Sequence, residues 1–143
     1  MKRLVVLAAD KSMRACVEAI LRRSRALGIQ ALQKTDFDVF VQPNYDSSVL
    51  LSGREFLRSQ AHRYEYGVLM CDRIGCGRES ETRESLERDI EVKLAQSGWQ
   101  DRSAAVVIDP ELEVWAWADS PHIEDAIGWR GKKPSIREWL KGA

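Results

Sequence analysis

Hydrophobic residues along the chain recur in two patterns, as short uninterrupted runs and as runs with a helical spacing. Residues 4–9, 68–71 and 104–108 are wholly apolar, which is typical of strands buried on both faces of a parallel sheet. Residues 37–41 form a further strand candidate, bounded by polar residues and a proline. The pattern therefore predicts four strands.

Between these runs, apolar residues return every three or four positions, as on one face of an amphipathic helix. The spacing predicts a helix after the first strand that ends at Gly28, a helical turn over 49–51, and helices over 54–61 and 83–96. Short helices are expected beyond residue 110.

Alternating strands and helices predict an α/β fold with a parallel sheet covered on both faces. We expect one three-layer, Rossmann-like domain over residues 1–143, with its four strands in the order 2-1-3-4 and a helical C-terminal part from about residue 110. The length of 143 residues, with 44% hydrophobic and 31% charged residues, suits one globular domain.

The charge and hydropathy of the chain restrict its possible partners and its location in the cell. The formal net charge is zero, so the chain as a whole is not a general attractor of nucleic acid. A basic tail nevertheless leaves contact with the phosphates of DNA or RNA open, beside the plainer alternative of a solvated helix end. No apolar run reaches the length of a membrane span, and the first is too short for a signal peptide. We expect a cytoplasmic protein without membrane contact.

The three cysteines and two histidines exclude some kinds of site. An odd cysteine count without CxxC spacing favours neither a disulfide framework nor structural zinc. We expect Cys71 to lie in the core and Cys76 to be exposed. A nucleophilic cysteine needs a base beside it, and the sequence does not place His62 or His122 next to Cys76, so cysteine catalysis is not expected.

Acidic residues follow three of the predicted strands. Asp10, Asp72 and Asp109 end the first, third and fourth strands, and Glu113 lies in the next helix. Ligands of open parallel sheets bind at the carboxyl ends of the strands, where the strand order reverses. Carboxylates gathered there repel one another unless a cation compensates them, and oxygen ligands suit Mg²⁺ or Mn²⁺. The predicted metal ligands are Asp10, Asp72, Asp109 and Glu113, and the candidate catalytic residues are Asp10, Asp72 and Glu113.

Each acid also has a plainer explanation. Asp10 could cap the helix that follows it, and Asp72 could form a turn. Asp109 before a proline is common at a helix entry, and Glu113 could be an exposed charge in a first helical turn. The sequence leaves both explanations open.

A glycine turn follows the third strand. Gly75 and Gly77 flank one cysteine, and successive amides in such a turn can hold an anion. Arg78 beside them could pair with phosphate or with Glu79 or Glu81. Gly75, Gly77 and Arg78 are therefore candidate cofactor-binding residues, although neither nucleotide-binding glycine motif is present.

Tryptophans are frequent in the C-terminal part. Trp115 and Trp117 are two positions apart, so on a helix their side chains point to different sides. Core packing is the default role, base stacking is a minority one, and homodimerisation through this part stays open.

Four stretches, LVVLAADKSM, CDRIGCGRE, VVIDPELEVWAWADSPH and PSIREWL, resemble the small component of bacterial methylation-associated anti-phage defence systems. The likeness runs over nearly the whole chain in the same order. It implies that the other proteins of such a system are the partners.

The strand-acid-helix layout also resembles TOPRIM-like proteins, whose acids bind Mg²⁺ for phosphoryl chemistry. By position, Asp10 corresponds to the first acid and Asp72 to the first member of the DxD pair. Ile74 stands where the second member is expected, and Glu113 is the candidate for that missing place.

Two hypotheses follow from these resemblances. The first is an accessory or binding subunit of a phage-defence system, with a degenerate acidic site. The alternative is an Mg²⁺- or Mn²⁺-dependent, nuclease-like phosphodiester enzyme.

Overall fold

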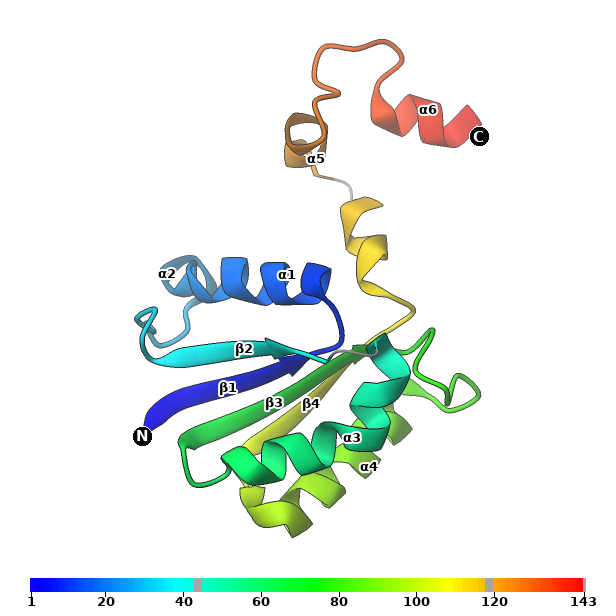
Figure 1. Ribbon diagram of the computed structural model, residues 1–143. Coiled ribbons are helices and arrows are strands. Elements are labelled where there is room, and N and C mark those ends of the chain that lie inside the picture. Colours follow the sequence, from blue (N-terminus) through cyan, green and yellow to red (C-terminus); the bar gives the residue numbers. More distant parts are fainter. Residues whose placement is uncertain (43–44, 118–119, 143) are drawn as a thin grey trace. The chain divides into compact units, whose positions relative to one another are not determined.

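The computed structural model describes residues 1–42, 45–117 and 120–142, and divides the chain into two compact units (Figure 1). Unit 1 covers Met1–Glu111 and unit 2 covers Leu112–Ala143. The C-terminal part that the sequence sets apart from about residue 110 corresponds closely to unit 2. The expectation of one domain over the whole chain stays a prediction.

Unit 1 is built on a four-stranded parallel sheet in the order β2-β1-β3-β4. This order confirms the predicted one. The four strands are β1 (Lys2–Ala8), β2 (Phe37–Val41), β3 (Tyr64–Asp72) and β4 (Ser103–Ile108). The inner strands β1 and β3 contain much of the buried apolar core, as their uninterrupted apolar runs predict.

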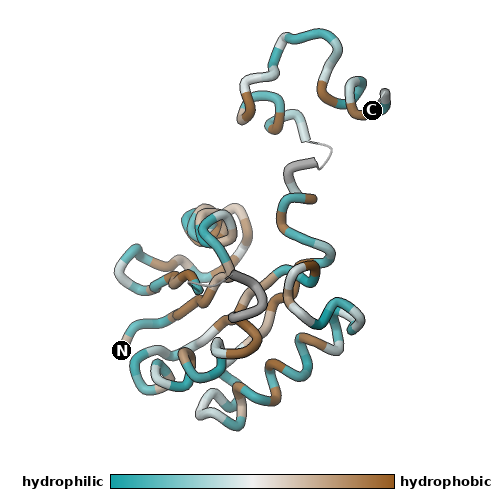
Figure 2. Tube along the Cα trace, turned by 45° about the vertical axis from the view of Figure 1, so that its right-hand side comes forward, coloured by the Kyte–Doolittle hydropathy of each residue, from teal (hydrophilic) through white to brown (hydrophobic). Residues whose placement is uncertain are grey.

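Helices cover both faces of this sheet, with α1 on one face and α3 and α4 on the other (Figure 1). Their bounds are α1 (Lys11–Leu21), α2 (Ser24–Leu27), α3 (Tyr45–Gln60) and α4 (Arg83–Leu94), and a π-helical turn, η1 (Ala95–Trp99), follows α4. The predicted turn over 49–51 and helix over 54–61 are one helix, α3. Figure 2 shows hydrophobic residues concentrated in the strands and interspersed with hydrophilic ones along the helices.

The face under α3 and α4 is tightly packed around Trp99. Its indole is fully buried and donates a hydrogen bond from Nε1 to the carbonyl oxygen of Leu57, at 2.9 Å. Gly67 on β3 lies against the ring, so that a Cβ at this position would come within 3.0 Å of it. A larger residue at position 67 would therefore require the indole to move by a few tenths of an ångström.

Unit 2 contains a 3₁₀-helix, η2 (Leu112–Trp117), and two short α-helices, α5 (His122–Ala126) and α6 (Ile136–Gly142). The rings of Trp129 and Trp139 lie 5.9 Å apart, and the Ile136 amide donates to Glu124 Oε1 at 2.9 Å. These contacts link α5, α6 and the loop between them.

Among the helices that the structure describes, none combines the length and apolar character that crossing a membrane would require.

Candidate functional site

Three of the predicted acids follow neighbouring strands at the carboxyl edge of the sheet. Ala8, the last residue of β1, pairs with Met70, and Asp10 and Asp72 each lie two residues further along the chain. Asp72 pairs with Ile108, directly before Asp109. The strand order and register therefore bring Asp10, Asp72 and Asp109 to one edge, as the sequence predicts.

Asp10 is the N-cap of α1. Its backbone is extended, and its Oδ1 accepts a hydrogen bond from the Met13 amide at 2.8 Å. This bond satisfies one of the amides that the first helical turn leaves without a partner. The plainer of the two explanations for Asp10 is thus realised, and the capping oxygen faces the helix.

Asp72 ends β3 and is buried, with only 4% of its surface exposed. A buried carboxylate requires compensating hydrogen bonds or charges. Of the predicted acids, Asp72 is the one that the fold removes most completely from water.

Asp109 is exposed and pairs with Arg73, with 2.7 Å between Asp109 Oδ1 and Arg73 Nε. This hydrogen bond raises the pKa of the Arg73 guanidinium. Arg73 also donates from Nη1 to the Glu79 carbonyl oxygen at 2.6 Å. Asp109 thereby ties the end of β4 to the loop that follows β3.

Glu113 lies in η2 of unit 2 and is exposed. Its grouping with Asp10 and Asp72 in a catalytic site stays a prediction. Within residues 1–42, 45–117 and 120–142, no three His, Cys, Asp or Glu side chains gather to hold a metal ion. Mg²⁺ often takes only one or two protein carboxylates, so the assignment of Mg²⁺ or Mn²⁺ also stays a prediction.

The glycine turn after β3 holds a carboxylate that belongs to the chain itself. Gly75 and Gly77 adopt positive φ angles of 91° and 86°, and their amides donate to Glu79 Oε1 at 3.2 and 3.0 Å. Backbone amides, first that of Glu79 itself and then that of Gly77, lower the pKa of the Glu79 carboxyl. The predicted anion-binding turn has the expected geometry, and Glu79 is the anion in it.

Arg78, the third candidate cofactor-binding residue, is engaged in ion pairs. Its guanidinium contacts Glu81 and also Asp89, where Nη1 and Oδ2 are 2.8 Å apart. The hydrogen bonds to Glu81 and then Asp89 raise the pKa of Arg78 further above its ordinary value. Of the two alternatives left open for Arg78, pairing with a neighbouring glutamate is realised.

Cys76 is buried, with 2% of its surface exposed, and the expectation of an exposed thiol is wrong. The turn folds the side chain inward, where Sγ accepts a hydrogen bond from the Arg78 amide at 3.4 Å. Cys71 is fully buried, as predicted.

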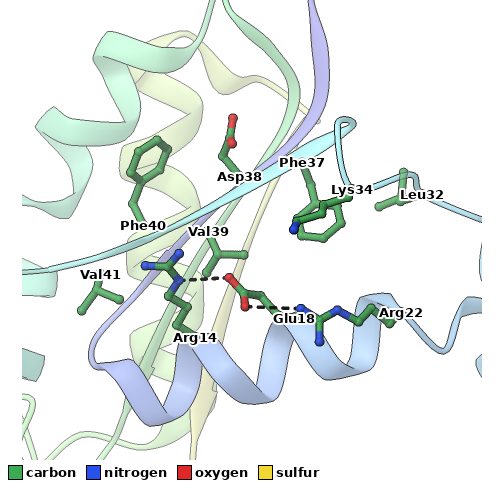
Figure 3. Close-up of a pocket in the computed structure, with 10 residues that line it drawn as sticks. All are labelled: Arg14, Glu18, Arg22, Leu32, Lys34, Phe37, Asp38, Val39, Phe40 and Val41. Atoms are coloured by element: carbon green, nitrogen blue, oxygen red, sulfur yellow. Dashed lines mark hydrogen bonds and ion pairs between the residues drawn. The ribbon is translucent and has the colours of Figure 1, made fainter.

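Sequence reasoning assigned no site to β2, yet a groove of about 640 Å³ runs between this strand and α1 (Figure 3). Arg14 and Glu18 of α1 and its C-cap residue, Arg22, line it, together with every residue of β2 and Lys34 before the strand. The spacing of four between the two arginines and Glu18 was visible in the sequence. The position of β2 at the end of the sheet, which leaves the groove open, depends on the strand order.

No protein-family model, curated protein or solved structure matches this chain. The likeness to defence components and to TOPRIM-like proteins thus depends on the quoted residues alone.

Proposed function

We propose that this chain is a non-catalytic accessory or binding subunit of a methylation-associated phage-defence system, with a TOPRIM-like fold and a degenerate acidic site. The defence setting comes from the sequence resemblance. The proposed absence of catalysis is supported by the bonds that the acids at the carboxyl edge of the sheet already make.

The single observation that supports this proposal is that two of the three acids at this edge, Asp10 and Asp109, are bonded to other groups of the chain. Asp10 accepts from the Met13 amide, and Asp109 is paired with Arg73. A metal ion would compete with the helix cap at Asp10 and with a guanidinium at Asp109. Ile74 replaces the second acid of the DxD pair, which removes a further oxygen ligand.

The alternative, an Mg²⁺- or Mn²⁺-dependent nuclease-like enzyme, is favoured by one observation. Asp10, Asp72 and Asp109 follow strands that are neighbours in the sheet, and the register places them at the same edge. In that case the metal would polarise a phosphate and activate a water molecule.

Calorimetry with Mn²⁺ and Mg²⁺ separates the two functions. For the accessory subunit, we expect no saturable heat up to millimolar metal and no cleavage of single- or double-stranded DNA. Saturable Mn²⁺ binding that is lost in Asp72→Asn, together with DNA cleavage lost in the same variant, would contradict the proposal. Circular dichroism of Asp72→Asn must first show that the fold is intact, because Asp72 is buried.

Co-purification tests the partner side of the proposal. A tagged chain expressed in its native host should retain the products of neighbouring genes through size-exclusion chromatography. A chain that elutes alone and cleaves DNA would support the enzyme instead.

A further inference from the structure

The groove between α1 and β2 combines a free strand edge with unbalanced positive charge. β2 is the terminal strand of the sheet, and within the described chain only β1 pairs with it. An unpaired strand edge is a template for another strand. The groove therefore offers both a backbone partner and side-chain partners to an incoming segment.

The hydrogen-bonding groups of β2 divide between its two edges. The Asp36 carbonyl accepts from Leu4, and the Gln42 amide donates to Ala8, both on the β1 side. Because these groups alternate along a strand, the amides and carbonyls of Phe37, Val39 and Val41 point to the open edge. Three residues thus present paired donors and acceptors.

The helix side of the groove is cationic. Arg14 and Arg22 share one carboxylate, Glu18, with N···O distances of 3.0 and 3.9 Å. The Arg14 bond uses Nε, and Arg14 makes no other side-chain hydrogen bond or ion pair to the described residues. Lys34 is exposed and has no ion pair with any residue that the structure describes. On this side three cations therefore face one acid, Glu18, while Asp38, the other acid that lines the groove, is paired with Lys2.

The face of β2 that points away from α1 presents an ion-paired acid and an aromatic ring. Asp38 and Phe40 point away from α1 (Figure 3). Asp38 is bonded to Lys2 and Tyr64, at 2.8 and 2.6 Å. Phe40 packs edge-on against Phe56, with 5.2 Å between ring centroids, and remains 38% exposed. An added strand would meet a partly exposed aromatic ring on this side.

We propose that the open edge of β2 binds an extended acidic segment of a partner protein as a fifth strand of the sheet. Side chains of a strand alternate between faces, so the segment carries Asp or Glu at every second position, facing Arg14, Arg22 and Lys34. The residues between them are apolar and face Phe40. Strand addition of this kind takes affinity from the main chain and specificity from alternate side chains. The inference rests on the proposed function, since an accessory subunit needs a surface that recognises its partner.

The test uses the whole chain and a fluorescent, acetylated heptapeptide of alternating glutamate and valine, with binding read by anisotropy. We expect saturable binding that a peptide of alternating lysine and valine does not show. A peptide of the same composition, with its glutamates in one block, should bind at least several-fold more weakly. Equal binding of the alternating and blocked peptides, or no binding of either, would overturn the proposal.

N-methylation of the peptide tests strand pairing without altering the protein. Methyl groups on all the glutamate nitrogens or on all the valine nitrogens should abolish binding for one set only. In an added antiparallel strand the glutamate amides face β2, and in a parallel one the valine amides do. Unchanged binding of both methylated peptides would show that no strand is added.

Charge reversal locates the peptide. Lys34→Glu and Arg22→Glu should each weaken binding by roughly five- to tenfold, as expected for reversal of an exposed charge pair. Arg88→Glu on α4 makes the same change on the other face of the sheet and should shift the affinity less than about twofold. Equal effects at Lys34 and Arg88 would contradict binding in the groove.

Other occupants of the groove are also outcomes of the test. A single-stranded oligonucleotide that displaces the peptide and depends equally on Lys34 would identify a nucleic-acid site and overturn the proposal. A dimer in sedimentation that Lys34→Glu dissociates would identify a second copy as the occupant and also overturn it.

The two proposals fail separately. A chain that co-purifies with its partners even as Lys34→Glu, and binds no peptide, would refute the groove and keep the accessory function. A chain that binds the peptide and also cleaves DNA with Mn²⁺ would refute the accessory function and keep the groove as a binding site.

Discussion

The two faces of the sheet are covered to different extents. On the α3 and α4 face, Trp99, Leu57 and Leu69 are 2% exposed or less. On the α1 face, Tyr66 is 51% and Val106 is 36% exposed, and the groove beside α1 runs along β2. Two long helices close the first face, whereas one long helix leaves part of the second open. The first face is therefore more completely buried than the second.

The largest effect on the free energy of unfolding is expected from Trp99→Ala. Removing a fully buried aromatic ring and its hydrogen bond to Leu57 should lower the free energy of unfolding by about 3–5 kcal/mol. Urea denaturation followed by circular dichroism measures this change. The matched control is Trp139→Ala in unit 2, where half of the residue is exposed, and a loss as large as that of Trp99 would contradict the comparison.

A smaller effect is expected at the start of α1. Asp10→Ala removes the hydrogen bond to the Met13 amide and should cost about 1 kcal/mol of unfolding free energy. Asp10→Ser keeps an oxygen acceptor and should recover most of that loss. If both variants lose Mn²⁺ binding while their stability is unchanged, Asp10 is a metal ligand rather than a cap.

The pH dependence of stability is expected to show the cluster around Asp38. Hydrogen bonds from Lys2 and then Tyr64 lower the pKa of the Asp38 carboxyl. A carboxyl with a depressed pKa stabilises the fold above its unfolded-state pKa, and this contribution is lost as the pH falls through the folded-state value. Between about pH 2 and 5, the unfolding free energy of the wild type should therefore fall more steeply than that of Asp38→Asn.

Tyr64 is expected to make the stability depend on pH in the alkaline range. Burial and then the hydrogen bond to Asp38 raise the pKa of Tyr64 to about 12. Its contribution to stability is present below the ordinary tyrosine pKa of about 10 and is lost as the pH rises towards the folded-state value. Tyr64→Phe should remove this alkaline slope, and an identical slope in the variant would assign it to other groups.

The smallest effect on stability is expected in the groove. Lys34 is exposed and has no ion pair within the described chain, so Lys34→Glu should change the unfolding free energy by less than about 0.5 kcal/mol. Thermal denaturation of this variant beside Arg88→Glu measures it. A clear loss of stability in Lys34→Glu would show that Lys34 stabilises the fold rather than serving as a free binding group.

The strand order was predicted from the alternation of strands and helices, which favours a doubly wound parallel sheet with right-handed crossovers, and the order β2-β1-β3-β4 agrees with it. The sequence pattern divided α3 into a turn over 49–51 and a helix over 54–61, and the two pieces are separated by Ser52 and Gly53. A Cβ at Gly53 would come within 2.7 Å of Leu69 Cδ1, so a larger residue inside this helix would require the Leu69 side chain to move. This contact is visible only in the folded chain.

The sequence indicated that Asp10, Asp72 and Asp109 end neighbouring strands, and it offered helix capping as one role for Asp10, but it did not indicate the partner of Asp109. Asp10 and Asp109 lie at the expected edge, yet their partners Met13 and Arg73 are a backbone amide and a side chain whose direction the sequence does not give. The groove was missed because the arginines of α1 alone look like a solvated face. These arginines line a groove only because β2 is the terminal strand of the sheet.

The burial of Trp99 also provides an optical probe. The four other tryptophans all follow Leu112, so Trp99 is the single indole emitter of unit 1. Its enclosed ring should fluoresce at short wavelength and resist quenching by acrylamide, whereas the exposed rings of Trp115 and Trp139 are open to the quencher. Quenching-resolved emission can therefore follow the melting of each unit in a single unlabelled sample.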